Sequence, residues 1–508
     1  MDRVRLLIAC CATLVVAVSL SAGCPAGPPA DVLQRATVQA DMEALIAHLD
    51  SSAYGKTVSW PQHVVLAYRL ALDRDPTVAE FAIIQMLREH PGLKRSDVLG
   101  LALASESDDL SWEACAGVVA RRNKSSFQPN ADVTNSARRL FATPPEHLAA
   151  IMDEEAVAEE AVVVDAPKGT ETPNENYGFY FGYLHAHSHL SLDGDGEPLD
   201  AYTTARESGM DFFSLSDHAE FLILWPWQNK WQQLRNASDA TDVPGEFAAL
   251  WGFEWSNPLL GHMSVFNTED FTHTLKTFRL RAMYDWLAAR PEGFAQYNHP
   301  GDYDFLGLEF GHFRPYPKAT AQMVGLEIWN ESRTFDQYFY NGSWDSDVSY
   351  MDVANQNGWR LGALGAQDNH RQGWGTMNDF RTGVLATELT REGISEAFRA
   401  RRFYATEDKD LELDFRCNGF PMGSTVNSGT LVFTVLVHSR SGDSFAQARL
   451  YRDGIQVATE ALEDTTSEAT FRGFNEAGYY YVIVTQTDDN DNNGRNDEAI
   501  SSPIWVQP

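Results

Sequence analysis

Residues 177–221 restrict the possible folds of this chain more than any other stretch. They read YGFYFGYLHAHSHLSLDGDGEPLDAYTTARESGMDFFSLSDHAEF: an aromatic strand-like run, a helix-like segment and a second apolar run. Side chains that can bind metal follow each apolar run: His185, His187, Asp193, Asp217 and His218. Residues i and i+2 of a strand point to the same face, so His185 and His187 can bind one ion together. The alternative is a parallel sheet in which these histidines only pack.

The same alternation of apolar and helical stretches continues to about residue 408. The runs FAALWGFEWS, HMSVFN, GFAQYNHP, MVGLEIWN and LGALGAQDNH predict strands, and RAMYDWLAAR, SYMDVANQNGW and TREGISEAFRARR predict helices. Strands that alternate with helices predict a parallel sheet covered by helices, here a barrel with its site at the C-terminal ends of the strands. Further candidate residues lie at or near these ends: Glu254, His262, His299, Asp368 and His370.

These residue types suit a site with more than one metal ion. Imidazole binds zinc, iron and manganese, and carboxylates can bridge two ions. Two ions about 3.5–4 Å apart can share a hydroxide, and coordination lowers the pKa of water towards about 7. We expect Asp217 to orient the site through a hydrogen bond. Arg371 and Arg333 would suit a phosphate group, or they pair with acidic surface residues.

Two motifs resemble those of the PHP (polymerase and histidinol phosphatase) family. They are His185-Ala-His187 followed by Asp193, with Asp rather than His in the third place, and the strand that ends in Asp217-His218. The resemblance covers residues 177–408. It implies a distorted (β/α)7 barrel with two or three divalent ions, zinc, manganese or iron, at its C-terminal mouth. It also implies a ligand set: His185, His187, Asp368 and a bridging Glu254 for the first metal, His262 and His299 for the second, and Asp193, His218 and His370 for the third.

The first 24 residues have the pattern of a secretory signal peptide. Arg3 and Arg5 precede an apolar run over residues 6–20, and Ser-Ala-Gly-Cys24 follows. This ending resembles a bacterial lipobox, although Ser21 occupies the usual Leu position. We expect either lipidation of Cys24 or ordinary cleavage, and in the first case an exported, lipid-anchored cell-envelope protein of a bacterium.

The sequence pattern after the signal segment predicts three domains. Residues 36–160 carry apolar residues three and four apart and predict an all-α domain, and 161–176 predict a linker. Residues 177–408 are the predicted hydrolase domain. From 409 to 508, strand-like runs such as LVFTVLVHS and YYYVIVTQT predict a β-sandwich. The predicted fold class is therefore α/β, a distorted (β/α)7 barrel between an N-terminal all-α domain and a C-terminal β-sandwich.

The segment DDNDNNGRNDE, near the C-terminus, resembles a calcium-binding loop. Oxygen ligands at alternate positions and a Gly at the sixth position fit such a loop: Asp489, Asp491, Asn493, Gly494 and Asp497. Ile500 stands at the twelfth position, where an EF-hand has a bidentate Glu. The alternative is a solvated turn rich in Asp and Asn.

The formal charge of -32 restricts the partners. Such acidity disfavours nucleic acid and anionic membranes, so we expect a small-molecule substrate and membrane contact only through a lipid anchor. Beyond the first 24 residues the cysteines are Cys115 and Cys417, and a disulfide between them is possible. The sequence gives no indication of the oligomeric state.

Together these features predict an exported hydrolase that uses a metal-bound hydroxide to cleave a phosphoester or a carbamate, ester or amide bond. The candidate catalytic residues are Glu254, Asp217 and Arg371. Two alternatives stay open: a non-catalytic surface protein that metal stabilises, and an interaction protein that acts through its flanking domains.

Overall fold

The computed structural model describes residues 172–508 except 192, 224–225, 258–259, 275, 302–308, 331–348 and 490–494. The chain divides into two units, Met1–Ala150 and Ile151–Pro508, and every described residue belongs to the second unit. Several predictions lie outside the described residues: the signal segment with Cys24, the helical domain with Cys115, the linker up to residue 171, and Arg333, Asp491, Asn493 and Gly494. No helix in the described part of the chain is long and apolar enough to cross a membrane.

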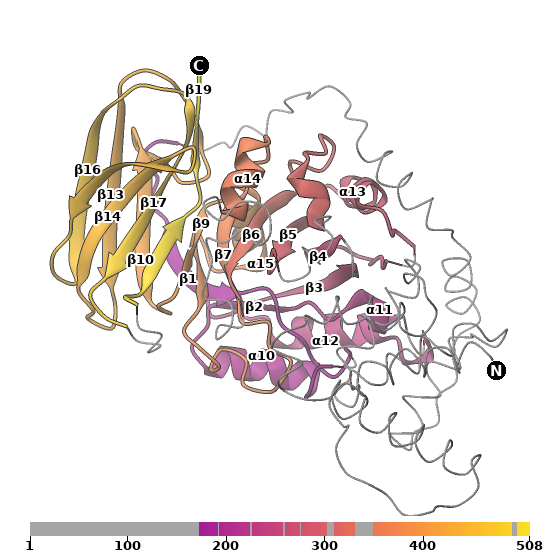
Figure 1. The fold of residues 1–508 in the computed structure, drawn as a ribbon. Helices are drawn as coiled ribbons and strands as arrows, with labels where there is room; N and C mark the ends of the chain where they lie inside the picture. Colours follow the sequence, from indigo (N-terminus) through magenta and orange to yellow (C-terminus); the bar gives the residue numbers. More distant parts are fainter. Residues whose placement is uncertain are drawn as a thin grey trace, which may run out of the picture. The chain divides into compact units, whose positions relative to one another are not determined.

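The described residues form a mixed α/β fold with one large sheet and a second, smaller sheet (Figure 1). The large sheet has the order β12-β19-β17-β18-β9-β8-β1-β2-β3-β4-β5-β6-β7, with β14 paired to β17 and β15 to β14. Its strands up to residue 406 are β1 (Gly178–Tyr183), β2 (Phe212–Leu215), β3 (Ala248–Asn257), β4 (Gly261–Phe266), β5 (Phe294–Asn298), β6 (Met323–Trp329), β7 (Gly362–Gly365), β8 (Arg381–Ala386) and β9 (Phe403–Thr406).

Helices connect these strands and pack on them. They are α10 (Pro198–Glu207), α11 (Ala219–Leu222), α12 (Lys230–Thr241), α13 (Leu280–Ala288), α14 (Tyr350–Gln356) and α15 (Arg391–Arg399), with the 3-10 turns η2 (Pro226–Gln228) and η3 (Glu309–Phe313). Helix α10 packs against α12 and β2 (Figure 1). Helix α15 packs against β3 and β8. Helix α15 buries an apolar face with helical spacing, and Thr390 caps its first turn by accepting a hydrogen bond from the Gly393 N–H.

The strand directions differ from the predicted parallel sheet at β4. The pairs β1–β2, β2–β3, β5–β6 and β6–β7 are parallel, whereas β4 is antiparallel to both β3 and β5. The predicted parallel sheet is therefore wrong at β4, and it is also wrong at β8, which is antiparallel to β1 and β9. Only residues 258–260 separate β3 from β4, which suits a hairpin and is too short for a parallel crossover. Because β4 runs in the opposite direction, it begins at the edge where β3 and β5 end.

The segment after β1 meets the segment after β7. Ala186 and Asn369 form a parallel bridge. His187 N donates to Asn369 O at 2.9 Å, and Asp368 N donates to His185 O at 3.1 Å. The polar residues that follow the first and the seventh strand are therefore fixed beside each other by their own backbone.

The chain from residue 411 onward is built of β-strands. The second sheet has the order β11-β10-β13-β16, and the other strands join the large sheet. The bounds are β10 (Leu411–Cys417), β11 (Phe420–Pro421), β12 (Thr425–Asn427), β13 (Leu431–Ser439), β14 (Phe445–Arg452), β15 (Ile455–Ala461), β16 (Thr466–Phe474), β17 (Gly478–Gln486), β18 (Glu498–Ser501) and β19 (Ile504–Gln507). Strand β18 pairs with β9, so the C-terminal strands continue the sheet that carries the candidate ligands.

The apolar core between the two sheets is shared. It contains residues of the C-terminal strands, such as Phe433 and Val482, together with Phe181, Leu385 and Tyr404 from β1, β8 and β9. Cys417 is buried in the same cluster as a free thiol. The C-terminal strands therefore bury side chains that belong to the preceding domain.

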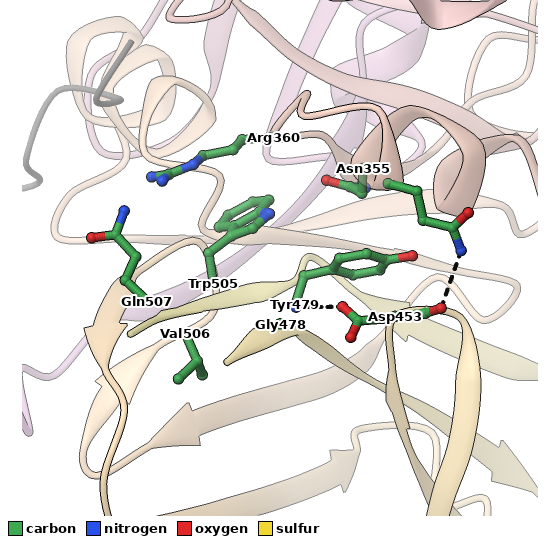
Figure 2. Close-up of a pocket in the computed structure, with 9 residues that line it drawn as sticks. Asn355, Arg360, Asp453, Gly478, Tyr479, Trp505, Val506 and Gln507 are labelled. Carbon is green, nitrogen blue, oxygen red and sulfur yellow. Dashed lines mark hydrogen bonds between the residues drawn. The ribbon is translucent and has the colours of Figure 1, made fainter. Parts of the chain in front are cut away.

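A pocket of 390 Å³ lies where α14 and the residues after it meet the C-terminal strands (Figure 2). Its lining includes Arg360, Trp505 and Tyr479. Gln356 Nε2 donates to the Asp453 carbonyl oxygen at 3.1 Å, and Tyr479 N donates to Asp453 Oδ1 at 3.0 Å (Figure 2). None of the candidate metal ligands lines this pocket, so it is separate from the site described next.

Candidate metal centre

The nine candidate ligands lie at or near strand ends and converge on one region. His185 and His187 follow β1, Asp193 lies in the loop before α10, His218 follows β2, Glu254 lies within β3, His262 is the second residue of β4, His299 follows β5, and Asp368 and His370 follow β7. Asp193 and His370 are partly buried and the others are buried. Three groups have ligand atoms within 4.8 Å of one another: His187, His218 and His370; His185, His187 and Asp368; and His185, Glu254 and His299.

His185 and His187 face a common point. Their Nε2 atoms lie 3.3 Å apart. Asp368 Oδ1 lies 3.1 Å from His185 Nε2 and 2.9 Å from His187 Nε2. Two imidazole nitrogens and a carboxylate oxygen around one point form a donor set for a divalent ion.

Glu254 lies at the centre of the cluster. Imidazole nitrogens of five histidines lie 2.7–3.7 Å from its carboxylate: His185, His187, His218, His262 and His299. The Asn298 side chain also donates to Glu254 Oε1, at 2.7 Å. A carboxylate offers about four lone-pair sites, so one Glu cannot accept hydrogen bonds from all these groups. Cations between the carboxylate oxygens and the imidazole lone pairs would satisfy both, and the donor set therefore fits bound divalent metals.

Asp193 and His370 extend the cluster beside His218. Asp193 Oδ2 lies 3.0 Å from His218 Nε2 and 3.6 Å from His370 Nε2. The His187 ring stacks on the rings of His218 and His370, with centroids 4.4 and 4.3 Å apart. The group of His187, His218 and His370 therefore shares His187 with the group of His185, His187 and Asp368.

The loop before α10 is folded tightly enough to aim Asp193 at His218. Gly196 has φ +85°, a conformation that L side chains rarely adopt. A Cβ atom on Gly194 would lie 2.2 Å from the carbonyl oxygen of Ser188. Both glycines are therefore required by the path of this loop.

The electrostatics of the site keep its carboxylates ionised. Burial disfavours the charged forms of Glu254, Asp193 and Asp368, but the neighbouring histidines outweigh burial and hold the pKa of each well below its ordinary value. Burial lowers the pKa of His187 to about 3 and that of His262 to about 4. These two rings are therefore neutral near pH 7 and offer a lone pair.

Three other histidines of the site have raised pKa values because carboxylates lie next to them. Burial acts against the charged forms of His185, His218 and His370, yet the adjacent carboxylates outweigh it. They raise the pKa of His185 and His218 well above the ordinary value and that of His370 to about 10. Without a cation, protons supply the positive charge that the carboxylates attract. Metal binding would have to release these protons.

Two candidate ligands have a left-handed backbone. Asp368 has φ +45° and His299 has φ +28°. Residues other than Gly seldom adopt this region, and such strain clusters at functional sites. The backbone conformation and the converging side chains thus mark the same region.

Glu327, on β6, is a residue of the site that the sequence analysis does not single out. It is 1% exposed, and its Oε1 accepts from His185 Nδ1 at 2.8 Å and from Gln296 Nε2 at 3.0 Å. Its Oε2 accepts from His299 N at 2.8 Å and from Asn330 Nδ2 at 2.7 Å. The carboxylate fixes the His185 ring so that Nε2 points into the cluster. The sequence signal for this role is an acidic residue within the otherwise apolar run MVGLEIW.

Asp217 binds the loop that carries His187 rather than a histidine ring. Its carboxylate accepts from the N–H and hydroxyl groups of Ser188 and Ser191, at 2.8–3.1 Å. The Ser191 hydroxyl in turn accepts from His218 N at 2.9 Å. The expected orienting hydrogen bond of Asp217 thus acts through two serines. Lys230 supports the same region by donating to two backbone carbonyl groups.

The remaining predicted residues are Arg371 and the calcium ligands. Arg371 is exposed and directly follows His370. Of the predicted calcium ligands, Asp489 and Asp497 are described and Asp497 is buried.

Comparisons with known proteins give limited likenesses. No family model matches the chain. An uncharacterised protein of Chlamydia pneumoniae is 29% identical over 150 residues, which cover 25% of this chain and 22% of that protein. The chain therefore matches about a fifth of the length of that relative.

Two solved structures show weak similarity. One is a two-domain protein from Bacteroides vulgatus that contains a predicted PHP-like metal-dependent phosphoesterase. Its sequence identity is 17% and its TM-score is 0.35, and the match covers 63% of this chain and 94% of that one. The other is the CARDB domain of the PF1109 protein from Pyrococcus furiosus in complex with di-metal ions, 16% identical with a TM-score of 0.15, covering 19% and 88%. These scores are low, and the function proposed below depends on the side chains of this chain.

Proposed function

We propose that residues 177–408 form a distorted (β/α)7 barrel of the PHP type and that the chain is a metal-dependent hydrolase. Its substrate would contain a phosphoester, carbamate, ester or amide bond. The observation that carries the proposal is the convergence of five imidazole nitrogens on Glu254, with Asp193 beside His218 and Asp368 beside His185 and His187. Bound zinc, manganese or iron would activate a water molecule and polarise the bond to be cleaved.

The protein orients three of the imidazole rings through their Nδ1 atoms. His185 Nδ1 lies 2.8 Å from Glu327, His187 Nδ1 lies 3.3 Å from the Ser191 hydroxyl, and His370 Nδ1 lies 2.9 Å from a backbone oxygen. A proton held on each Nδ1 leaves Nε2 with a lone pair that faces the cluster. These contacts prepare the rings as ligands before any ion binds.

Arg371 is the residue we propose for binding an anionic group of the substrate. Its side chain is exposed and follows His370, the outermost of the candidate ligands. A guanidinium at this position can donate two hydrogen bonds to a phosphate or carboxylate. This assignment is supported by position alone and favours the phosphoester class.

Metal analysis together with a substrate screen tests the proposal. We expect at least two equivalents of transition metal per chain after gentle purification, and turnover of one class among phosphate esters, carboxylic esters, amides and carbamates. Less than one equivalent, with no activity restored by added metal, would overturn it. Bound metal without turnover of any class would favour a non-catalytic, metal-stabilised surface protein.

The location of the protein is proposed from its first 24 residues alone. The apolar run and Cys24 support export and lipidation. Mass spectrometry of the native protein decides between a diacylglycerol on Cys24 and an unmodified mature N-terminus elsewhere.

A further inference from the structure

A second group of buried oxygen atoms lies at the edge where β9, β17 and β18 meet. Glu407 directly follows β9, Gln486 ends β17, and Asp497 directly precedes β18. Because β18 is antiparallel to both neighbours, the end of β9, the start of β18 and the end of β17 share one edge of the sheet. Strand pairing therefore places these three residues, which are distant in the sequence, at one corner of the sheet.

Backbone and side-chain hydrogen bonds hold this corner in place. Glu407 N donates to Glu498 O at 3.0 Å, and Glu407 Oε2 accepts from Glu498 N at 3.0 Å. Gln486 N donates to Asp497 O at 2.8 Å, and its side-chain Nε2 donates to Asp408 Oδ2 at 2.8 Å. The Gln486 amide thus faces the residue next to Glu407, and its own backbone is bound to Asp497.

Two side-chain oxygens at this corner lack a hydrogen-bond donor. Glu407 is 2% exposed and Gln486 is 0% exposed. Within the described part of the chain, no group donates a hydrogen bond to Glu407 Oε1 or to Gln486 Oε1. Burying an acceptor without a donor costs free energy, and the cost is larger for a carboxylate. Gln486 is uncharged, so its oxygen is evidence that does not depend on the acidic residues.

Negative charge dominates the surroundings. Glu407 and Asp408 directly follow β9, Asp497 directly precedes β18 and Glu498 begins it, and all four are buried. Arg449 pairs with Glu498, and Arg495 Nη2 lies 4.0 Å from Glu407 Oε1, the limit of an ion pair. Burial, with Asp497 and Glu498 nearby, raises the pKa of Glu407 to about 8.

We propose that this corner is a calcium site formed by Glu407, Gln486 and Asp497. All three offer oxygen, which calcium prefers, whereas the histidine cluster offers nitrogen and suits transition metals. Asp497 also belongs to the loop whose spacing resembles a calcium-binding loop, so sequence pattern and buried geometry indicate the same place. The ion would clamp β9, which belongs to the sheet of the histidine cluster, to the C-terminal strands β17 and β18.

Calcium titration of the full chain tests the proposal. The protein is purified in calcium-free buffer, and calcium chloride is then added while heat of binding and thermal unfolding are measured. We expect about one equivalent of calcium to bind at this corner, and Tm to rise by several degrees when calcium is in large excess over Kd. Glu407→Gln should weaken calcium binding at least tenfold. The exposed residue Glu460 supplies the control, Glu460→Gln, which should bind as the wild type does.

Two further variants keep the outcome clear. Asp497→Asn should weaken binding as Glu407→Gln does, with near-UV circular dichroism to verify that each variant is folded. His218→Ala, in the histidine cluster, should leave the calcium response unchanged, so this test does not depend on the proposed hydrolase. A wild-type chain without any calcium response, or folded Glu407→Gln and Asp497→Asn variants that bind calcium as tightly as the wild type, would overturn the proposal.

Discussion

Glu254 is surrounded by more nitrogen atoms than its carboxylate can accept hydrogen bonds from. This arrangement predicts that the negative charge of Glu254 is needed to bind metal. His218 Nδ1 lies 2.7 Å from Glu254 Oε2, whereas His262 Nδ1 and His185 Nε2 lie 3.2 and 3.3 Å from Oε1. Its negative charge is what would hold cations close together. A neutral side chain of the same shape would keep the packing and remove only that charge.

Glu254→Gln is therefore expected to lower turnover by roughly a hundredfold or more, because ligand-sphere changes commonly cost 10–100-fold even for outer partners. Metal content should fall with it. Turnover and elemental analysis measure both effects. Glu246→Gln, at an exposed residue paired with Arg206, is the matched control and should retain both. Near-native turnover with full metal content in Glu254→Gln would mean that Glu254 is not a ligand.

Glu327→Gln is expected to weaken metal binding by about 10–100-fold without removing a ligand. Glu327 is a positioning residue, since it accepts the His185 Nδ1 proton at 2.8 Å. A neutral amide accepts that proton less strongly and no longer favours Nε2 as the metal-facing atom. Competition with a metal chelator measures the affinity. Excess metal should restore turnover in this variant, whereas a merely unfolded variant would not recover.

Glu407 gives a pH dependence with a defined sign. Burial raises its pKa from the ordinary value of 4.5 to about 8. Between these values the unfolded chain loses a proton that the folded chain keeps, so the contribution of Glu407 to stability falls as pH rises from about 4.5 to 8. In calcium-free protein, the Tm of the wild type minus the Tm of Glu407→Gln should therefore decrease as pH rises across this range. A difference that is constant with pH would contradict the raised pKa.

The residues of the site differ in how well a sequence can reveal them. His185, His187 and His218 are recognisable because polar side chains end apolar runs. Glu327 is not, because it lies inside such a run, and only the folded chain shows that His185 is its neighbour. The role of Asp217 is similar, since its hydrogen bonds to Ser188 and Ser191 depend on a loop whose path the glycine spacing only suggests.

At the scale of elements, the β3–β4 hairpin explains why His262 joins the cluster. His262 is the second residue of β4, directly opposite Asn298, and Glu254 lies opposite Ser264. The alternation of strands and helices predicts parallel neighbours and misses this reversal. The short connection between the two apolar runs is the signal that favours a hairpin. The positions of β1 to β7 were therefore predictable, whereas β8 and β9 were not predicted as strands and the direction of β4 was missed.

Helix α14 is joined to the C-terminal strands by a buried carboxylate. Asp352 is 3% exposed and accepts from the Ser349 hydroxyl at 2.7 Å, Tyr479 OH at 3.0 Å and Tyr481 OH at 3.2 Å. Removing the carboxylate would leave buried hydroxyl groups without their acceptor. Each such group costs about 1–3 kcal/mol.

Asp352→Ala should therefore reduce the free energy of unfolding by about 2 kcal/mol or more. Denaturant unfolding measures this loss. The double variant Tyr479→Phe/Tyr481→Phe removes the donors instead, and adding Asp352→Ala to it should cost less than Asp352→Ala costs alone. Strict additivity of the two changes would show that these hydrogen bonds do not stabilise the junction. Metal content should be unaffected in all three proteins.

At the scale of the whole described chain, the strands up to β9 and the strands from β10 onward do not form separate domains. Strand β9 pairs with β8 on one side and with β18 on the other. The sequence pattern changes near residue 409, and β10 begins at Leu411. The pattern does not indicate which strands pair across that point, because pairing between distant strands depends on contacts that no local pattern records.

A chain that ends at Asp408 is therefore expected to fold poorly. It would expose the edge of β9, which β18 covers, and the side chains of Phe181, Leu385 and Tyr404, which are at most 3% exposed in the full chain. An unpaired strand edge beside newly exposed apolar side chains promotes aggregation. We expect low soluble yield and no cooperative thermal unfolding from this shortened chain.

A point variant separates loss of the strand pairing from loss of the whole C-terminal region. Ile500 pairs with Ile483 on one side and Ala405 on the other, so Ile500→Pro breaks the β9–β18 junction within the full chain. Val457→Pro is the control, because Val457 lies in β15, whose only partner strand is β14 among the described strands. Ile500→Pro should lower Tm and transition-metal content together, since β9 lies in the sheet that carries the histidine cluster, while Val457→Pro should affect both less. If a chain ending at Asp408 instead stays soluble, unfolds cooperatively and binds metal as the full chain does, the two regions are independent and the shared sheet contributes little to the site.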